Sequence, residues 1–305
     1  MIRLLATLGI GTCLLTLSGC DLVVMNPSGD IARQQASLIW IATWLMLIVI
    51  VPVIIMTAWF AWKYRASNRD AEYDPKWHHS VTVEIVVWTI PLIIIMILGG
   101  ITFVATHRLD PYNPITRISE DKPLPADIEP LNIEVVALDW KWLFLYPQQG
   151  IATVNEIAAP LDRQIRFKIT SGSVMNSFYI PALAGQIYAM SGMQTELHAV
   201  INEPGVFDGF SANYSGHGFS HMRFKFHGVD EAGFDAWVAR VRGSDQVLHE
   251  PAYIELEEPT TAHPVVYYGS VQENLYHAIL NRCVAGRDTC MDELMSHRGS
   301  AHENH

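Results

Sequence analysis

Cysteine offers the most direct chemistry in this chain of 305 residues, which contains four of them. Cys283 and Cys290, near the C-terminus, could form a disulfide if this part of the chain is exported to an oxidising compartment. The alternative is a two-thiolate metal site, which needs further ligands, and His277 and His297 are only loosely placed candidates. We therefore favour the disulfide.

Histidine offers a second set of candidate ligands, since His217, His221 and His227 lie close together in the sequence. Three imidazoles could bind copper or zinc. His217 and His221, however, lie among glycines without a helix to place them on one face, and His227 alternates with Phe226 as a strand residue does. A structural role is therefore favoured over a metal site.

The N-terminal residues have the order of a bacterial secretory signal. An arginine precedes an apolar stretch at residues 4–17, which is too short to span a membrane, and small residues then lead to Cys20. Residues 17–20 (LSGC) look like a lipobox, in which the cysteine thiol receives diacylglycerol and the chain is cut just before it. We expect residues 1–19 to be a lipoprotein signal peptide and Cys20 to be lipidated; the alternative is an uncleaved anchor.

Two stretches, residues 37–62 and 81–105, are long and apolar enough to cross a membrane as helices. At about 1.5 Å per residue, each exceeds the roughly 30 Å of the hydrocarbon layer. Pro52 and Pro91 are tolerated in such helices. A buried core helix is the alternative, and the length of both stretches argues against it.

Basic residues set the orientation of the two spans. The loop at residues 63–80 contains Lys63, Arg65, Arg69 and Lys76, whereas residues 20–36 contain only Arg33. Because basic loops stay on the cytoplasmic side, we expect this loop in the cytoplasm and both ends of the mature chain outside. A lipidated N-terminus agrees with this topology.

Glu84 is the single acidic residue within the second span. A carboxylate there is costly unless it faces a protein partner or water. The residue chemistry leaves two interpretations open: a functional carboxylate, or an end residue that reaches the interface. The neighbouring His78 and His79 are interpreted as interfacial residues rather than as ligands.

The pattern changes after residues 106–130, a linker rich in proline and charge. Seven short strand-like runs separated by Gly, Pro, Asn and Ser occupy residues 131–138, 142–146, 164–170, 174–181, 196–201, 205–210 and 223–229. Such runs predict a β-sandwich or barrel over residues 131–229.

A helical region is predicted over residues 230–290. Apolar residues at helical spacing indicate two amphipathic helices, and these residues are Phe234, Trp237, Val238 and Val241, followed by Val271, Leu275, Ala278 and Ile279. Residues 291–305 lack an apolar period and are expected to form a disordered tail.

Charge and composition exclude two classes of protein. The chain has 20 basic and 31 acidic residues, a net charge of −11, which would repel the phosphates that a nucleic-acid-binding protein must neutralise. Its apolar residues are half of the total and are bunched near the N-terminus, which excludes a simple soluble enzyme.

This layout resembles subunit II of the haem-copper respiratory oxidases. Residues 83–91 (VEIVVWTIP) are similar to the second-span signature of that family, and residues 139–142 (DWKW) lie where it has an aromatic segment. Residues 173–181 and 209–216 resemble its copper-site loops. The resemblance implies a two-helix transmembrane hairpin, a periplasmic cupredoxin-like β-sandwich and C-terminal amphipathic helices.

The copper ligands of that family are not present here. Copper-containing members use two histidines, two cysteines, a glutamate and a methionine, and these positions fall, in that order, on Asn176, Phe219, Ser211, Ser215, Asn213 and Met222. Only the methionine is retained. Because a serine hydroxyl does not replace a soft bridging thiolate, the resemblance implies that this site binds no metal.

Loss of the copper site is typical of the quinol-oxidising branch, the cytochrome bo-type ubiquinol oxidases. Residues 155–158 (NEIA) and 186–195 (QIYAMSGMQT) look like subunit II of that branch. The resemblance implies a proton-pumping complex of the bacterial inner membrane that passes electrons from ubiquinol to oxygen. The haems, the copper and the ubiquinol site are expected on subunit I, with no cofactor on this chain.

The same resemblance implies the partners and the role of single residues. Subunit I, the other oxidase subunits and the lipid bilayer are expected partners, and cytochrome c is not. Glu84 falls on the family position at the cytoplasmic mouth of a proton-uptake path. Trp140 and Trp142 are assigned to packing, because without copper their rings have no acceptor for an electron.

Two other functions are consistent with the residues. One is a cytochrome c oxidase subunit II with a rebuilt metal centre, which the near-infrared band of a mixed-valence copper pair would reveal. The other is a free-standing lipoprotein that uses an empty cupredoxin-like domain for binding, which detergent would extract without haem.

Overall fold

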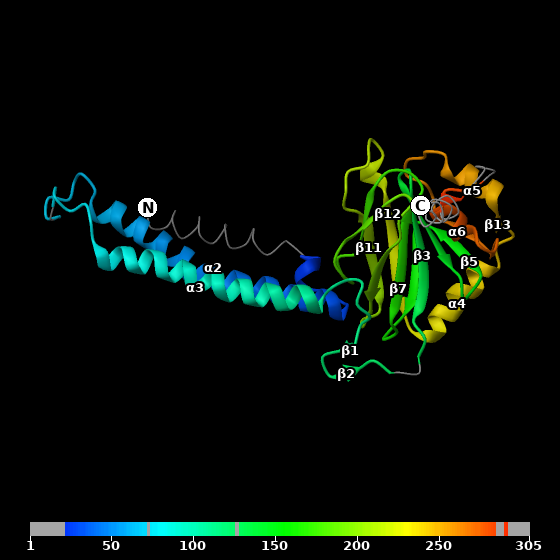
Figure 1. The fold of residues 1–305 in the computed structure, drawn as a ribbon, viewed down its shortest axis with the longest axis horizontal. Coiled ribbons are helices and arrows are strands. Elements are labelled where there is room, and N and C mark those ends of the chain that lie inside the picture. Colours follow the sequence, from blue (N-terminus) through cyan, green and yellow to red (C-terminus); the bar gives the residue numbers. More distant parts are fainter. Residues whose placement is uncertain (1–21, 72–73, 126–127, 285–289, 292–305) are drawn as a thin grey trace, which may run out of the picture. The chain divides into compact units, whose positions relative to one another are not determined.

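The computed structural model describes residues 22–71, 74–125, 128–284 and 290–291 (Figure 1). The chain divides into two compact units, residues 34–113 and residues 1–33 together with 114–305. The expected signal peptide, Cys20 and all but the first residue of the expected tail lie outside the described residues.

The unit of residues 34–113 is built from two long helices, α2 (Asp30–Lys63) and α3 (Val81–Arg108). Both are long and apolar enough to span a membrane, and their apolar side chains are largely exposed. Helix α2 begins at Asp30 rather than at residue 37, because polar residues can continue a helix beyond the apolar stretch. Pro52 and Pro91 lie inside the helices, as expected.

The residues before α2 belong to the β-rich unit and form hydrogen bonds with it. After the short helix η2 (Val23–Met25), the backbone N–H of Gly29 donates to the carbonyl of Ala182 at 2.9 Å. A side chain at Gly29 would place its Cβ 2.7 Å from two backbone carbonyl oxygens, so glycine allows this close approach. Asp30, 2 % exposed, forms an ion pair with Arg117 at 2.9 Å.

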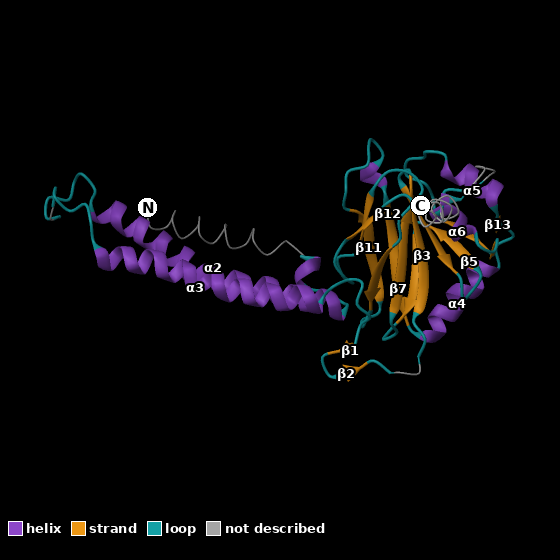
Figure 2. Cartoon of the chain, viewed as in Figure 1, coloured by secondary structure: helices purple, strands orange, loops and turns teal. Residues whose placement is uncertain are grey.

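Two sheets form the β-domain, as Figure 2 shows in orange. The six-stranded sheet has the order β10-β7-β3-β4-β5-β14, with β3 (Leu131–Leu138), β4 (Lys141–Tyr146), β5 (Ile151–Val154), β7 (Ile165–Ser171), β10 (Thr195–Ala199) and β14 (Val266–Tyr268). The five-stranded sheet has the order β6-β12-β11-β8-β9, with β6 (Glu156–Pro160), β8 (Asn176–Tyr179), β9 (Ile187–Ala189), β11 (Gly205–Ser211) and β12 (Arg223–Val229). Short pairs are formed by β1 (Arg117–Ser119) with β2 (Lys122–Pro123) and by β13 (Val247–Leu248) with β15 (Ser270–Val271).

All seven predicted runs contain a strand, which confirms the β-sandwich. Strands β5, β6, β9 and β14 were not predicted, because they have only three to five residues each and β6 has two alanines among its five. Strand β4 is buried at every position, so it shows no alternation of apolar and polar residues.

Aromatic side chains fill the space between the two sheets. Trp142 is fully buried and lies edge-on to Phe178, with ring centroids 5.4 Å apart. Phe178 in turn stacks on Phe224 at 5.4 Å. The assignment of Trp142 to the core is therefore confirmed.

The C-terminal region packs against the sheets beside β5 (Figure 2). Helix α4 (Glu231–Arg242) buries the four apolar residues that predicted it. The second predicted helix is shorter than expected: α6 (Leu275–Leu280) excludes Val271, which lies in β15. Helix α5 (Glu250–Glu257) was not predicted, because only two of its side chains are buried.

Candidate functional site

Six positions of this chain match the copper-ligand positions of the family. Four of them lie together where β8 begins and β11 ends, and these are Asn176, Ser211, Asn213 and Met222. Ser211 Oγ lies 3.1 Å from Asn176 Oδ1 and 3.2 Å from the carbonyl oxygen of Asn213. The backbone N–H of Ser211 donates to the carbonyl of Met222 at 3.2 Å. Asn176 and Met222 are buried, so hydrogen bonds between protein groups hold this end of the sandwich together.

The atoms at these positions do not suit copper. The four side chains are two amides, a hydroxyl and a thioether, and none is a thiolate or an imidazole. The amide of Asn213 is occupied as well, because its Nδ2 donates to the carbonyl of Met175 at 3.2 Å. Within the described residues, no three His, Cys, Asp or Glu side chains are grouped so that they could hold a metal ion.

The other two positions, Ser215 and Phe219, make different contacts. The carbonyl of Ser215 accepts a hydrogen bond from Trp140 Nε1 at 3.0 Å. Phe219 lies in the short helix η3 (Phe219–His221), with its ring 5.6 Å from that of Tyr214.

Trp140 covers the loop that contains Ser215. A Cβ atom at Gly218 would lie 2.3 Å from the Trp140 ring, so the indole rests directly on this glycine. Trp140 lies in the turn between β3 and β4 and has a positive φ of 65°. Because this backbone conformation is unfavourable for a bulky residue, the contacts of its side chain must hold it there. It packs against the edge of the core, as the sequence assignment expected.

The three candidate histidines have different surroundings. The His217 ring lies edge-on to Trp140 at 5.0 Å, and His221 is exposed in η3. His227 Nε2 lies 3.6 Å from a carboxylate oxygen of Glu156. The three histidines therefore contact different residues.

Glu84 lies in the first turn of α3, next to His79. His79 Nδ1 is 2.6 Å from Glu84 Oε1, and the two side chains are 59 % and 52 % exposed. The backbone N–H of Glu84 donates to the carbonyl of Ser80 at 3.0 Å, which begins the helix. His78, in contrast, contacts the carbonyl of Lys76. The sequence identified Glu84 but missed His79 as its partner.

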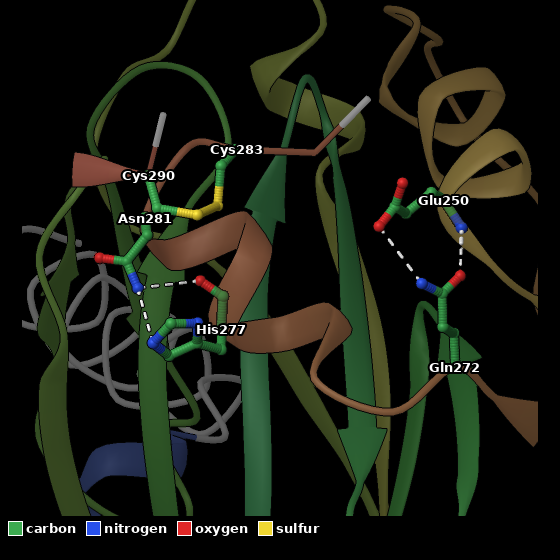
Figure 3. Close-up of a disulfide and its surroundings, with 6 residues drawn as sticks. All are labelled: Glu250, Gln272, His277, Asn281, Cys283 and Cys290. Atoms are coloured by element: carbon green, nitrogen blue, oxygen red, sulfur yellow. Dashed lines mark hydrogen bonds between the residues drawn. A yellow bond between two sulfur atoms is a disulfide. The ribbon is translucent and has the colours of Figure 1, made fainter. Parts of the chain in front are cut away.

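A disulfide joins Cys283 and Cys290 just after α6, with Cα atoms 4.8 Å apart (Figure 3). The structure thus contains the bond that the sequence favoured over a two-thiolate metal site. His277, considered there as a further ligand, contacts Asn281, whose Nδ2 lies 3.0 Å from its Nε2.

Sequence reasoning missed a partly buried carboxylate, Glu156, at the start of β6, whose side chain is 14 % exposed. Its Oε1 accepts hydrogen bonds from Tyr267 Oη at 2.6 Å and from Trp237 Nε1 at 2.9 Å. Arg240 and His227 each approach it to 3.6 Å. Glu156 therefore ties α4 and β14 to the five-stranded sheet.

Opposing effects set the pKa of Glu156. Burial raises it, but the hydrogen bonds from Tyr267 and Trp237 and the charges of His227 and Arg240 together lower the pKa below its usual value. Burial and the bond to Glu156 raise the pKa of Tyr267 to about 12. The carboxylate is thus held in its charged form.

The NEIA string that contains Glu156 has a second structural role. Asn155 adopts a positive φ of 57°, which asparagine tolerates better than most residues. Its Oδ1 accepts from the backbone N–H of Trp142 at 2.9 Å, and its Nδ2 donates to the carbonyl of His263 at 2.8 Å. This string therefore connects the core to the C-terminal region.

Lys141, a buried charge, also holds the C-terminal region. Its Nζ donates to the carbonyl of Glu258 at 2.7 Å and to Thr260 Oγ1 at 2.6 Å, directly after α5. Burial lowers the pKa of Lys141, while the nearby Asp139 and Glu258 oppose that shift. A cation at the end of a helix also suits the helix dipole.

We predict that Glu156→Gln destabilises the β-domain by about 2 kcal/mol, because it removes the charged acceptor of the hydrogen bonds from Tyr267 and Trp237. A group whose pKa is lowered on folding stabilises the protein above its unfolded pKa and loses that effect as pH falls. The loss in the free energy of unfolding, relative to the parent chain, should therefore be largest at neutral pH. It should shrink as pH falls below 4.5, the ordinary pKa of a glutamate.

Thermal unfolding midpoints of the full chain in detergent, measured from neutral to acidic pH, check this prediction. Glu255→Gln, at an exposed position on α5, is the matched control and should change little. A difference that stays constant across this pH range would contradict the role given to the Glu156 charge.

Comparisons with known proteins agree with this structure. Residues 131–229 match the family model "Cytochrome C oxidase subunit II, periplasmic domain", and residues 242–287 match "COX Aromatic Rich Motif". The first match has the same bounds as the predicted sandwich, which supports its cupredoxin-like fold.

Similar proteins match over most of the chain. Cytochrome bo(3) ubiquinol oxidase subunit 2 of Pseudomonas aeruginosa is 52 % identical, over 95 % of this chain and 85 % of the relative. The Pseudomonas putida protein of the same name is 50 % identical, over 88 % and 83 %. Ubiquinol oxidase subunit 2 of Acetobacter aceti is 47 % identical, over 90 % and 87 %. The chain belongs to the family of ubiquinol oxidase subunit 2.

Proposed function

We propose that this chain is subunit 2 of a proton-pumping ubiquinol oxidase in a bacterial inner membrane. The observation that carries the proposal is the match to ubiquinol oxidase subunits over nearly the whole chain. The relatives do not favour a cytochrome c oxidase subunit or a free-standing lipoprotein, so neither is proposed here.

The reaction of such a complex oxidises two ubiquinol molecules and reduces one oxygen molecule to two water molecules. In our proposal subunit I holds the haems, the copper and the ubiquinol, and this chain holds no redox cofactor. The amide and hydroxyl groups at Asn176, Ser211 and Asn213 support that division, because they bond to protein groups and cannot replace thiolates. The β-domain then serves as a rigid periplasmic part of the complex.

The proposed membrane arrangement follows from charge and hydropathy. Helices α2 and α3 span the bilayer and pack against subunit I, and the basic loop at residues 63–80 lies in the cytoplasm. The β-domain then lies in the periplasm.

The substrate of the purified complex tests this function. We predict that the complex oxidises ubiquinol but not reduced cytochrome c, because this chain offers no copper pair to receive electrons from a soluble donor. Metal analysis of the separated subunit should find no stoichiometric copper. Rapid oxidation of cytochrome c, together with two coppers per chain, would show that the function is wrong.

Lipidation of Cys20 is a further part of the proposal. The LSGC string at residues 17–20 supports cleavage before Cys20 and attachment of acyl chains to it. The intact mass of the purified subunit should equal that of residues 20–305 plus the lipid. A mass that includes residues 1–19 would contradict this step.

We further assign Glu84 the uptake of protons from the cytoplasm. A carboxylate near the end of a membrane span is costly unless it meets water or a partner, which makes a functional role the better explanation. The contact with His79 supports this, because it gives the carboxylate a polar partner at the start of the helix.

We predict that Glu84→Ala slows turnover by about a hundredfold, the lower end of the range expected when a positioned proton-transfer group is removed. Quinol oxidase activity and proton uptake in proteoliposomes measure this effect, and the haem content reports assembly. Asp70→Ala removes the same charge from the exposed loop and should leave both rates near those of the parent. Normal turnover in the Glu84 variant would remove the proposed role.

A further inference from the structure

We propose that the cavity between the six-stranded sheet and α6 binds a small zwitterion, a molecule in which a few bonds join an ammonium group to an acid group. A free amino acid with an aliphatic side chain and the headgroup of phosphatidylethanolamine share this chemistry. The inference goes beyond the function proposed above, because it concerns residues that this function does not involve.

The cavity has a volume of about 630 Å³ and lies on the face of the six-stranded sheet that α6 covers. Sites for small molecules commonly measure roughly 300–1,000 Å³. The cavity has an apolar lining, which includes Leu145, Ile151, Val271, Leu275 and Leu280. Its size and its lining therefore suit a small ligand with an aliphatic part.

Three polar groups at this cavity have no direct partner among the described residues. Glu134 and Lys168 are register partners in the parallel pair of β3 and β7, yet the head group of neither forms a hydrogen bond or an ion pair there. Tyr276 is 8 % exposed, and its hydroxyl is buried without a hydrogen-bond partner. Because buried polar groups normally have partners, this set of groups indicates a missing ligand.

Other polar residues around the cavity are already paired. Glu196, the second register partner of Lys168, is bound by Arg166, whose Nη2 lies 2.9 Å from its carboxylate. Gln272 and Glu250 share two hydrogen bonds (Figure 3). These neighbours therefore leave the ammonium of Lys168 available to a ligand.

The electrostatics of the cavity agree with this arrangement. Burial raises the pKa of Glu134, and the charge of Lys168 only partly offsets that shift. Burial also raises the pKa of Tyr276, and the charges of Glu134 and Glu196 raise it further, so the phenol lies within the field of these carboxylates. Tyr276 therefore keeps its proton and is a hydrogen-bond donor.

A zwitterion gives each of the three groups a partner. Its ammonium pairs with the carboxylate of Glu134, and its acid group pairs with Lys168 and accepts a hydrogen bond from Tyr276. Neighbouring strands lie about 4.8 Å apart, so opposite charges on register partners match a ligand whose own charges are a few bonds apart. A simple cation would instead meet the like charge of Lys168, and a simple anion that of Glu134.

Calorimetric titration of the full chain in detergent, freed of bound lipid, tests the chemistry of the ligand. We expect L-leucine or glycerophosphoethanolamine to bind at one site per chain. Isocaproate lacks the ammonium of leucine, and isoamylamine lacks its carboxylate. Each should bind more weakly than leucine by about tenfold or more, the loss expected when one charged hydrogen-bonding group is removed.

Variants test whether this cavity is the site. Glu134→Gln and Lys168→Gln should each weaken binding by about tenfold. Glu255→Gln and Lys76→Gln, which change the same charges at exposed positions, are the matched controls and should bind like the parent. Tyr276→Phe should weaken binding by about fivefold and leave the thermal midpoint of the unliganded chain unchanged, because its hydroxyl has no partner to lose.

The two zwitterions distinguish the source of the ligand. Binding of leucine alone would identify a free amino acid, and binding of glycerophosphoethanolamine alone would identify a lipid headgroup; either result supports the proposal. Isoamylamine or isocaproate that binds as tightly as leucine would overturn the zwitterion. The proposal is wrong if neither zwitterion binds, or if Glu134→Gln and Lys168→Gln both bind like the parent.

Discussion

The hydrogen bonds around Ser211 hold together the loops of the β-domain that resemble copper-site loops. Buried polar groups must find partners, and here Asn176 Oδ1 and the carbonyl of Asn213 both lie within reach of one hydroxyl. In the copper-containing members that the sequence resembles, metal ligands occupy these positions. Short, neutral side chains satisfy each other instead, so this end of the sandwich needs neither thiolates nor a charge to hold its loops.

The C-terminal region depends on a second constraint, the burial of the six-stranded sheet on both faces. Strand β4 is buried throughout, so residues after the sandwich must cover the side that does not face the second sheet. Apolar contacts provide most of this cover, and Glu156 and Lys141 fix its position through directed hydrogen bonds. Because each charge has several partners, removing one partner leaves a buried ion only partly satisfied.

Local patterns predicted much of this fold because its main elements bury one face. Most of the seven strand runs and helix α4 have clear periods, and the two spans stand out by their length. Strands β5 and β6, with their small side chains, and helix α5, with two buried residues, have no such signal. Their positions depend on contacts between distant residues, which a local pattern cannot contain.

The site could be predicted only as far as residue types allowed. Glu84 stood out because a carboxylate is rare in a membrane span, and the substitutions at the copper positions stood out against the family pattern. The pairing of His79 with Glu84 depends on the extended backbone at Ser80, and the cluster at Glu156 includes Tyr267, which is far away in the sequence. Neither set of contacts can be recognised from the sequence, because both depend on how the backbone folds.

These features divide the chain into parts with separate tasks. Glu84 and His79 lie in the helical unit, whereas Ser211 and Glu156 lie in the β-rich unit. Sites without shared partners contribute additively, so we expect changes that destabilise the β-domain to leave the proton uptake proposed for Glu84 unaltered. The substitutions at the copper positions and the proton uptake proposed for Glu84 then concern separate parts of the chain, so the loss of one does not require the loss of the other.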